Sequence, residues 1–195
     1  MNHLILASGS PRRKELLEIV NLPFTVQKSS VHENITGEKS PAQVVEELAL
    51  RKAQSVHLGN HNAIVLGADT IVAFNGRILG KPKNEQDAVE MISMLSGKQH
   101  TVYTGVSIVS ESKVVVFHEA TDVTFWKLTK DEIEMYVRAG ESMDKAGSYG
   151  IQGIGATLVR AISGDYYSVV GLPIARTVRE LKAFGITQDL SQSRN

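Results

Sequence analysis

The residues between an apolar run, 4–7, and the first predicted helix have the character of an anion-binding turn. Ser8 and Ser10 offer hydroxyl groups, and Pro11 suits the start of a helix because its missing amide would have no intrahelical partner. Free amides and the positive end of a helix dipole favour phosphate at such a position. Three cations follow in the first helical turn, at Arg12, Arg13 and Lys14. Cations are unfavourable there unless an anion compensates them, although an ordinary capped helix with solvated cations is the alternative.

Asp69 is the most informative carboxylate, because it follows six mostly apolar residues, 63–68, that are typical of a fully buried strand. We expect the strand to end there, at the kind of sheet edge where α/β folds bind ligands. The alternative is that Asp69 caps the following turn. Thr70 and a new strand follow directly, however, and leave no helix to cap. The sequence therefore favours a functional role for Asp69.

Three further residues carry only weak signals when each is considered alone. Glu33 lies in a polar loop, Lys52 on the flank of a predicted helix, and Lys81 in a Gly-Lys-Pro turn, and such residues are usually solvated. Considered together with Asp69 and Arg13, they form a coherent set. Two carboxylates suit a divalent metal, and three cations suit phosphate oxygens. This set fits phosphoryl transfer, in which catalysis is mostly positioning and charge neutralisation.

The composition limits the class of protein and of partner. The chain has 195 residues, 42% of them hydrophobic, which fits one large domain or two lobes built on one sheet. Its 21 basic and 21 acidic residues give a net charge of +0, so neither nucleic acid nor an anionic membrane is an expected partner. The absence of cysteine excludes disulfides and thiolate catalysis. With no secretory signal and no apolar run of membrane-spanning length, we expect a cytoplasmic protein.

Capping signals predict the helices that must position these residues. Ser40 with Gln43 and Thr129 with Glu132 form capping boxes, and each box predicts a helix that begins after its first residue. Predicted helices follow Ser10, Ser40, Asn84 and Thr129, and a last one runs from Pro173 to Phe184.

Apolar and alternating runs predict the strands, and Asn75-Gly76 is a typical hairpin turn between two of them. The glycine-rich stretch 144–155 is too irregular for a helix or strand and is predicted to be a folded loop. The predicted strands are 4–7, 22–26, 63–68, 71–74, 77–79, 101–109, 113–126, 156–162 and 166–170.

Several motifs occur in an order that resembles the Maf family of nucleoside triphosphate pyrophosphatases. The motifs are ASGSPRRKELL, GADTIV, GKP, LSG, DKAGSYGIQG and VVGLP, and the resemblance extends over residues 4–184. It implies an α/β fold in which a long, twisted mixed sheet and flanking helices form two lobes, similar to the inosine triphosphatase architecture, with the active site in the cleft. Residues 1–187 would form this single two-lobed domain, and residues 188–195 a flexible tail.

The resemblance also implies a reaction and its partners. Family members hydrolyse a nucleoside triphosphate between the α and β phosphates, which gives a monophosphate and pyrophosphate, with a divalent metal such as magnesium, manganese or cobalt. The resemblance further implies a homodimer. Family members are also associated with inhibition of septum formation, so a nucleotide-responsive regulatory protein with incidental hydrolysis is the alternative.

Family roles are carried over by position. Asp69 matches the family's proton acceptor, and Glu33 matches a metal-associated carboxylate. In the mechanism that we expect, Glu33 and Asp69 together hold the metal. A carboxylate bound to metal is a poor base, and the sequence leaves open whether Asp69 is the base, a ligand or both. One departure is His32, where many relatives carry an acidic residue. The phosphate-contacting groups of the family match Ser8, Arg13, Lys52 and Lys81.

The resemblance bears on the substrate through Arg12, Thr70 and Gln152. All three match the subfamily that acts on dTTP and UTP, whereas the subfamily that acts on 7-methyl-GTP differs at these places. The Gln152 side chain offers both a donor and an acceptor to the edge of a thymine or uracil ring. CTP and modified pyrimidine nucleotides are further candidate substrates.

Overall fold

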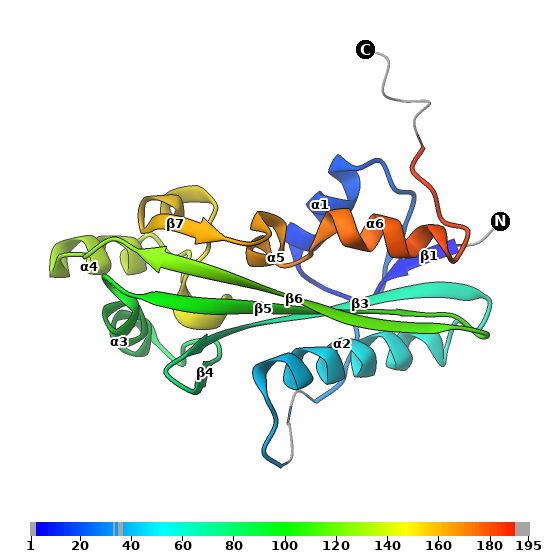
Figure 1. Ribbon diagram of the computed structural model, residues 1–195, viewed down its shortest axis with the longest axis horizontal. Coiled ribbons are helices and arrows are strands. Elements are labelled where there is room, and N and C mark those ends of the chain that lie inside the picture. Colours follow the sequence, from blue (N-terminus) through cyan, green and yellow to red (C-terminus); the bar gives the residue numbers. More distant parts are fainter. Residues whose placement is uncertain (1–2, 33, 35–36, 190–195) are drawn as a thin grey trace. The chain divides into compact units, whose positions relative to one another are not determined.

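The computed structural model describes residues 3–32, 34 and 37–189 as a mixed α/β protein (Figure 1). Seven strands form one mixed sheet in the order β2-β1-β3-β5-β6-β7, with β4 paired to β3. The strands are β1 (His3–Leu6), β2 (Thr25–Val26), β3 (Ala63–Phe74), β4 (Arg77–Leu79), β5 (Gln99–Val109), β6 (Val114–Phe125) and β7 (Val159–Ser163). This architecture confirms the predicted α/β fold with a mixed sheet and flanking helices.

Helices account for most of the remaining regular structure. None of those described is both long and apolar enough to span a membrane. The α-helices are α1 (Pro11–Ile19), α2 (Pro41–His57), α3 (Glu85–Leu95), α4 (Lys130–Arg138), α5 (Tyr166–Val170) and α6 (Ile174–Lys182), and the short 3-10 helices are η1 (Ala146–Ser148) and η2 (Gly153–Thr157).

The chain divides into two compact units, and β3, β5 and β6 contribute residues to both. The first unit comprises Met1–Asp69, Thr104–Glu119 and Gly171–Asn195. The second unit comprises Thr70–Tyr103 and Ala120–Val170.

In the first unit, α2 packs directly on the backbone of two strands. A Cβ atom on Gly67 of β3 would lie 2.4 Å from the carbonyl oxygen of Ala49, and one on Gly105 of β5 would lie 2.3 Å from that of Val45. Only glycine permits so close an approach. The capping box that opens α2 is present as predicted, with both hydrogen bonds between Ser40 and Gln43. The helix is therefore held closely against the strand that carries Asp69.

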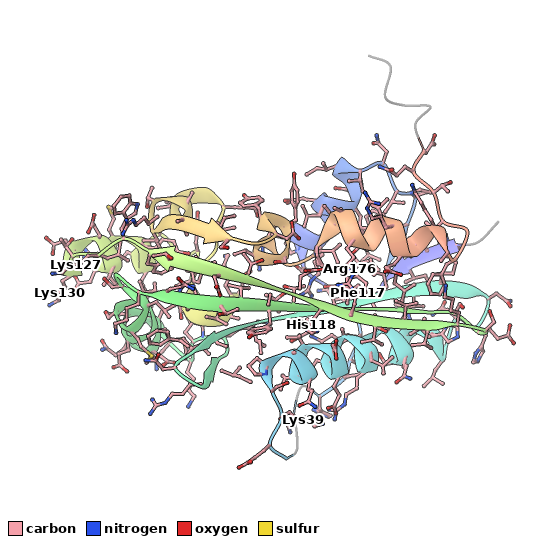
Figure 2. The ribbon with its side chains drawn as sticks, viewed as in Figure 1. Lys39, Phe117, His118, Lys127, Lys130 and Arg176 are labelled. Carbon is pink, nitrogen blue, oxygen red and sulfur yellow. The ribbon has the colours of Figure 1, made fainter. Side chains whose placement is uncertain are left out.

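The sheet of the first unit lies between α2 and α6, as two successive residues of β6 show. The Phe117 ring contacts the guanidinium of Arg176 on α6, 4.3 Å from the ring centroid, whereas His118 Nδ1 lies 2.8 Å from Glu46 Oε1 on α2. Successive strand residues point to opposite faces, so the two helices cover opposite sides. Figure 2 shows Arg176 next to Phe117, with His118 toward α2, and the Arg176 guanidinium also donates to Glu119 Oε1 at 2.8 Å.

The C-terminal segment of the first unit contacts the end of α1. Gln188 Nε2 donates to the Val20 carbonyl at 3.0 Å, and the Asp189 amide donates to the Asn21 carbonyl at 2.8 Å. These bonds fall within the stretch expected from the sequence to be a tail, of which 190–195 lie outside the described residues.

The second unit has its own hydrophobic core, to which α3 and α4 contribute residues. The predicted hairpin is confirmed, since Phe74 pairs with Arg77 across Asn75 and Gly76, whose φ angles are 48° and 73°. Asn84 caps α3 and the Thr129 box opens α4, both as predicted. Buried residues of this core include Val72, Ile92, Leu95, Val102, Phe125, Tyr136, Tyr149 and Leu158.

Two element predictions are wrong. Residues 166–170 form the short helix α5 rather than a strand, because the Asp165 carboxylate accepts the amides of Tyr167 and Ser168 at 3.2 and 3.0 Å. Residues 63–68 and 71–74 are not separate strands but one continuous strand, β3. Asp69 therefore lies within a strand, not at its end.

Candidate active site

Asp69 forms an ion pair with Lys52 inside the first unit. Lys52 Nζ lies 2.6 Å from Asp69 Oδ1, and the two side chains are only 12% and 10% exposed. A carboxylate in so enclosed a place is stable only with a partner, which explains how Asp69 is accommodated in the middle of a strand. The close packing of α2 on β3 brings the lysine to the carboxylate. The sequence places Lys52 on the flank of a helix, and nothing in its pattern indicated that this lysine would be buried.

The turn between β1 and α1 brings Ser8 and Arg13 together. Ser8 is 7% exposed, and its Oγ accepts hydrogen bonds from the Ser10 amide at 3.2 Å and from Arg13 Nη1 at 3.1 Å. Ser10 occupies the N-cap position, as expected, but among the described residues its hydroxyl makes no capping hydrogen bond. The Ser8 hydroxyl, and not that of Ser10, accepts a backbone amide of this turn. Arg12 lies half-buried in the same first turn.

Two further groups lie at this turn that sequence reasoning missed. Arg13 Nε donates to the Gly171 carbonyl at 2.8 Å, and the motif VVGLP was the available signal for that contact. The Lys28 side chain passes so close to Gly9 that a Cβ atom there would lie 2.7 Å from Lys28 Cε. The turn is thus bordered by an additional cation, for which the sequence carried no signal.

In the second unit, the turn that carries Lys81 is bonded to the glycine-rich loop that carries Gln152. The Gly147 amide donates to the Gly80 carbonyl at 3.0 Å, immediately before Lys81. Lys81 and Gln152 are both exposed, whereas Thr70 is half-buried in β3. The stretch 144–155 is a folded loop, as predicted. Among its residues, all of which the structure describes, the only helical segments are η1 and the first part of η2.

Glu33 lies outside the described residues. At the next position, the Asn34 carbonyl accepts a hydrogen bond of 2.8 Å from Arg51 Nη1 of α2. Arg51 and Lys39 both pair with Glu47 on the same helix. The bond from Lys39, helped by the charge of Arg51, holds the pKa of Glu47 below its ordinary value.

The described part of the chain contains no group of three or more His, Cys, Asp or Glu residues that could hold a metal. Asp69 supplies an oxygen ligand of the kind that magnesium and manganese prefer. The second predicted ligand, Glu33, is not among the described residues. The donor chemistry of Asp69 therefore fits a hard divalent cation.

Among its described residues, the first unit thus combines the enclosed carboxylate of Asp69 with several cations, among them Arg12, Arg13 and Lys52. A carboxylate can accept a proton from water or bind a metal, and guanidinium and ammonium groups neutralise phosphate oxygens. Such a combination suits the displacement of a phosphate leaving group.

Known proteins with similar sequences cover nearly the whole chain. A family model described as Maf-like protein matches residues 3–184. A Bacillus cereus (strain G9842) protein named dTTP/UTP pyrophosphatase is 60% identical over 186 residues, which are 95% of this chain and 97% of that protein. A protein of the same name from Bacillus mycoides (strain KBAB4) is 60% identical over 184 residues, which are 94% and 96% of the two chains.

One similar solved structure is that of the Staphylococcus aureus Ham1 protein. The alignment has a TM-score of 0.50 and 14% sequence identity, and it covers 81% of this chain and 80% of that one. At this identity the likeness concerns the fold alone, and it agrees with the architecture expected from the sequence.

Proposed function

The chain belongs to the Maf family, and we propose that it hydrolyses nucleoside triphosphates, with dTTP and UTP as its main substrates, to a monophosphate and pyrophosphate. The observation that carries this proposal is the enclosed ion pair of Lys52 with Asp69, whose carboxylate lies in the motif GADTIV that resembles the family's. The relatives named dTTP/UTP pyrophosphatase support the choice of substrate at 60% identity. CTP and modified pyrimidine nucleotides are secondary candidates, and a homodimer in the cytoplasm belongs to the same proposal.

The chemical step is an in-line displacement at the α-phosphorus. The oxygen of a water molecule forms a bond to that phosphorus while the bond to the oxygen bridging the α and β phosphates breaks. The electron pair leaves with pyrophosphate, and the proton of the water passes to Asp69. Lys52, 2.6 Å from Asp69, orients the carboxylate, and in this proposal its charge also neutralises a phosphate oxygen.

The turn after β1 serves the phosphates in this proposal. Ser8 and Arg13 are already bonded to each other at 3.1 Å, so the guanidinium is held in place before a substrate arrives. Lys81 is the corresponding cation of the second unit. Asp69 and Glu33 would hold a divalent cation such as magnesium, manganese or cobalt, which would supply charge neutralisation to the phosphate oxygens.

Base selectivity is assigned to Arg12, Thr70 and Gln152. Gln152 is exposed and its amide can match both the carbonyl and the N–H group of a thymine or uracil edge. A base that lacks this pairing would leave polar groups unmatched, which is a strong basis for discrimination.

The test is pyrophosphate release from dTTP, UTP, CTP, GTP and 7-methyl-GTP with magnesium or manganese. Asp69→Asn should lower kcat by about 10²-fold or more, because it removes the proton acceptor. Asp122→Asn is the matched control, since Asp122 is also a strand carboxylate, with hydrogen bonds from Gln99 and Thr101. Release by Asp69→Asn within twofold of the parent enzyme, or turnover of purine nucleotides alone, would overturn the proposal.

A further inference from the structure

Gln152 lies in a segment that no strand ladder or α-helix holds. It falls between η1 and η2, where Ser148 and Gly153 have φ angles of 64° and 60°. Such a segment keeps one conformation only if other groups fix its backbone. Two side chains from α4 and the turn after it supply those contacts, one on each side of Gln152.

The first contact comes from Tyr136 of α4. Its ring is 1% exposed within the core of the second unit, and its hydroxyl oxygen accepts the Gly150 amide at 3.1 Å. Gly155 packs against both partners of this hydrogen bond. A Cβ atom on Gly155 would lie 2.0 Å from the Gly150 carbonyl oxygen and 3.2 Å from the Tyr136 hydroxyl. The backbone two residues before Gln152 is therefore fixed to a buried side chain.

The second contact comes from Glu141, which follows α4. Its carboxylate accepts the Ile154 amide at 3.4 Å, two residues after Gln152. Gly153 lies against the same carboxylate, and a Cβ atom there would be 2.8 Å from Glu141 Oε1. Lys145 in turn donates to the Glu141 carbonyl, which links this turn to the start of the loop.

We propose that Tyr136, assisted by Glu141, is a positioning residue for base selectivity that acts through the backbone on either side of Gln152. This inference rests on the proposed function, in which Gln152 reads the base. A hydrogen bond to a base edge weakens steeply when donor and acceptor are misplaced. Loosening the segment should therefore weaken the recognition of the base while the displacement at phosphorus continues.

The decisive variant is Tyr136→Phe, which keeps the buried ring and removes only the hydroxyl. We expect kcat/KM for UTP relative to GTP to fall about tenfold, mainly through a higher KM for UTP, with kcat within about threefold of the parent enzyme. Thr121→Val is the matched control, because it also removes one buried hydroxyl from the second unit, bonded to Ser168 at 2.8 Å. This control should leave the selectivity ratio unchanged.

A double variant separates positioning from general loss of structure. In a Gln152→Ala background, Tyr136→Phe should lower the ratio no further, because its effect passes through Gln152. Backbone amide exchange over 149–155 should be faster in Tyr136→Phe than in the parent protein. An unchanged ratio in Tyr136→Phe, an additive effect with Gln152→Ala, or unchanged exchange would overturn the inference.

A wrong assignment of Gln152 and a wrong positioning role for Tyr136 would give different results. A parent enzyme without preference for pyrimidines, or a Gln152→Ala variant with the parental ratio, would refute the assignment of Gln152 and with it the selectivity role of Tyr136. A selective parent and a non-selective Gln152→Ala variant, beside an unaltered Tyr136→Phe enzyme, would refute the positioning role alone.

Discussion

Arg13 and Gly171, 158 residues apart in the chain, are joined by a hydrogen bond of 2.8 Å from the arginine Nε to the glycine carbonyl. The same guanidinium donates from Nη1 to Ser8 at 3.1 Å. Gly171 has a φ of 131°, which favours glycine, so the direction of its carbonyl depends on the residue type. Arg13 thus ties the turn after β1 to the segment that leads into α6.

Arg13→Lys should separate this bridging geometry from simple charge. Lysine keeps the positive charge but cannot make two divergent bonds from one planar group. We expect kcat/KM for dTTP to fall about 10- to 100-fold in steady-state assays of pyrophosphate release. Arg138→Lys is the control, since Arg138 pairs with Glu134 on the surface of α4. Parental kcat/KM in Arg13→Lys would show that charge alone suffices.

Lys52→Met should destabilise the fold because it leaves Asp69 enclosed without its partner. We expect a loss of about 3 kcal/mol in the free energy of unfolding, measured by urea denaturation. Lys14→Met is the matched control, because Lys14 pairs with Glu18 in a bridge whose side chains are 54% and 52% exposed. That exposed pair should contribute less than about 0.5 kcal/mol. Similar losses in the two variants would contradict the enclosed character of the Lys52 site.

His100 predicts a pH dependence of stability. Burial lowers its pKa from 6.5 to about 4, although the charge of Asp122 acts in the opposite direction. Between these values the unfolded chain binds more protons than the folded one, so the free energy of unfolding falls as the pH drops from 6.5 towards 4. The loss from this group is about 3 kcal/mol at most.

Urea denaturation at several pH values between 4.5 and 7.5 would measure this loss. His100→Asn should flatten the dependence in that interval. His118→Asn should preserve it, because the His118 side chain is 37% exposed. A His100→Asn curve parallel to that of the parent protein would assign the pH dependence to other groups.

Gly67→Ala should disturb the seat of α2 on β3. The added methyl group would lie 2.4 Å from the Ala49 carbonyl oxygen and 2.8 Å from the Ala53 amide nitrogen, and backbone atoms cannot yield as a side chain does. We expect a loss of about 1–3 kcal/mol in unfolding free energy and a lower kcat, because Lys52 moves with the helix. In Gly59→Ala the nearest atom is at 3.8 Å, so its stability should match the parent.

Local signals predicted those elements whose start depends on nearby residues. Both capping boxes and the Asn75-Gly76 hairpin are correct because their hydrogen bonds close within a few residues. Residues 166–170 were assigned wrongly, since aromatic and β-branched side chains favour strands and this preference yielded to the cap at Asp165. That cap was itself readable in the sequence as an N-cap residue.

The site was predictable in its residue types but not in its pairing. Asp69 was recognised from the apolar run before it, yet its place within a strand depends on Lys52, a partner 17 residues away. The burial of Lys52 depends in turn on the register between α2 and β3, which Gly67 sets through tertiary contact. Likewise, no local pattern marked Tyr136 as the group that binds Gly150.

The contact of α2 with Gly67 and Gly105 joins main chain to main chain. Carbonyl and amide atoms are common to every residue, so the spacing between this helix and its strands is insensitive to which side chains surround it. Relatives could exchange much of their neighbouring core and still present a lysine at the same height above the carboxylate. Because Gly67 and Gly105 have no side chains, they fix the distance between α2 and the sheet, and sequence changes elsewhere would leave that distance unchanged.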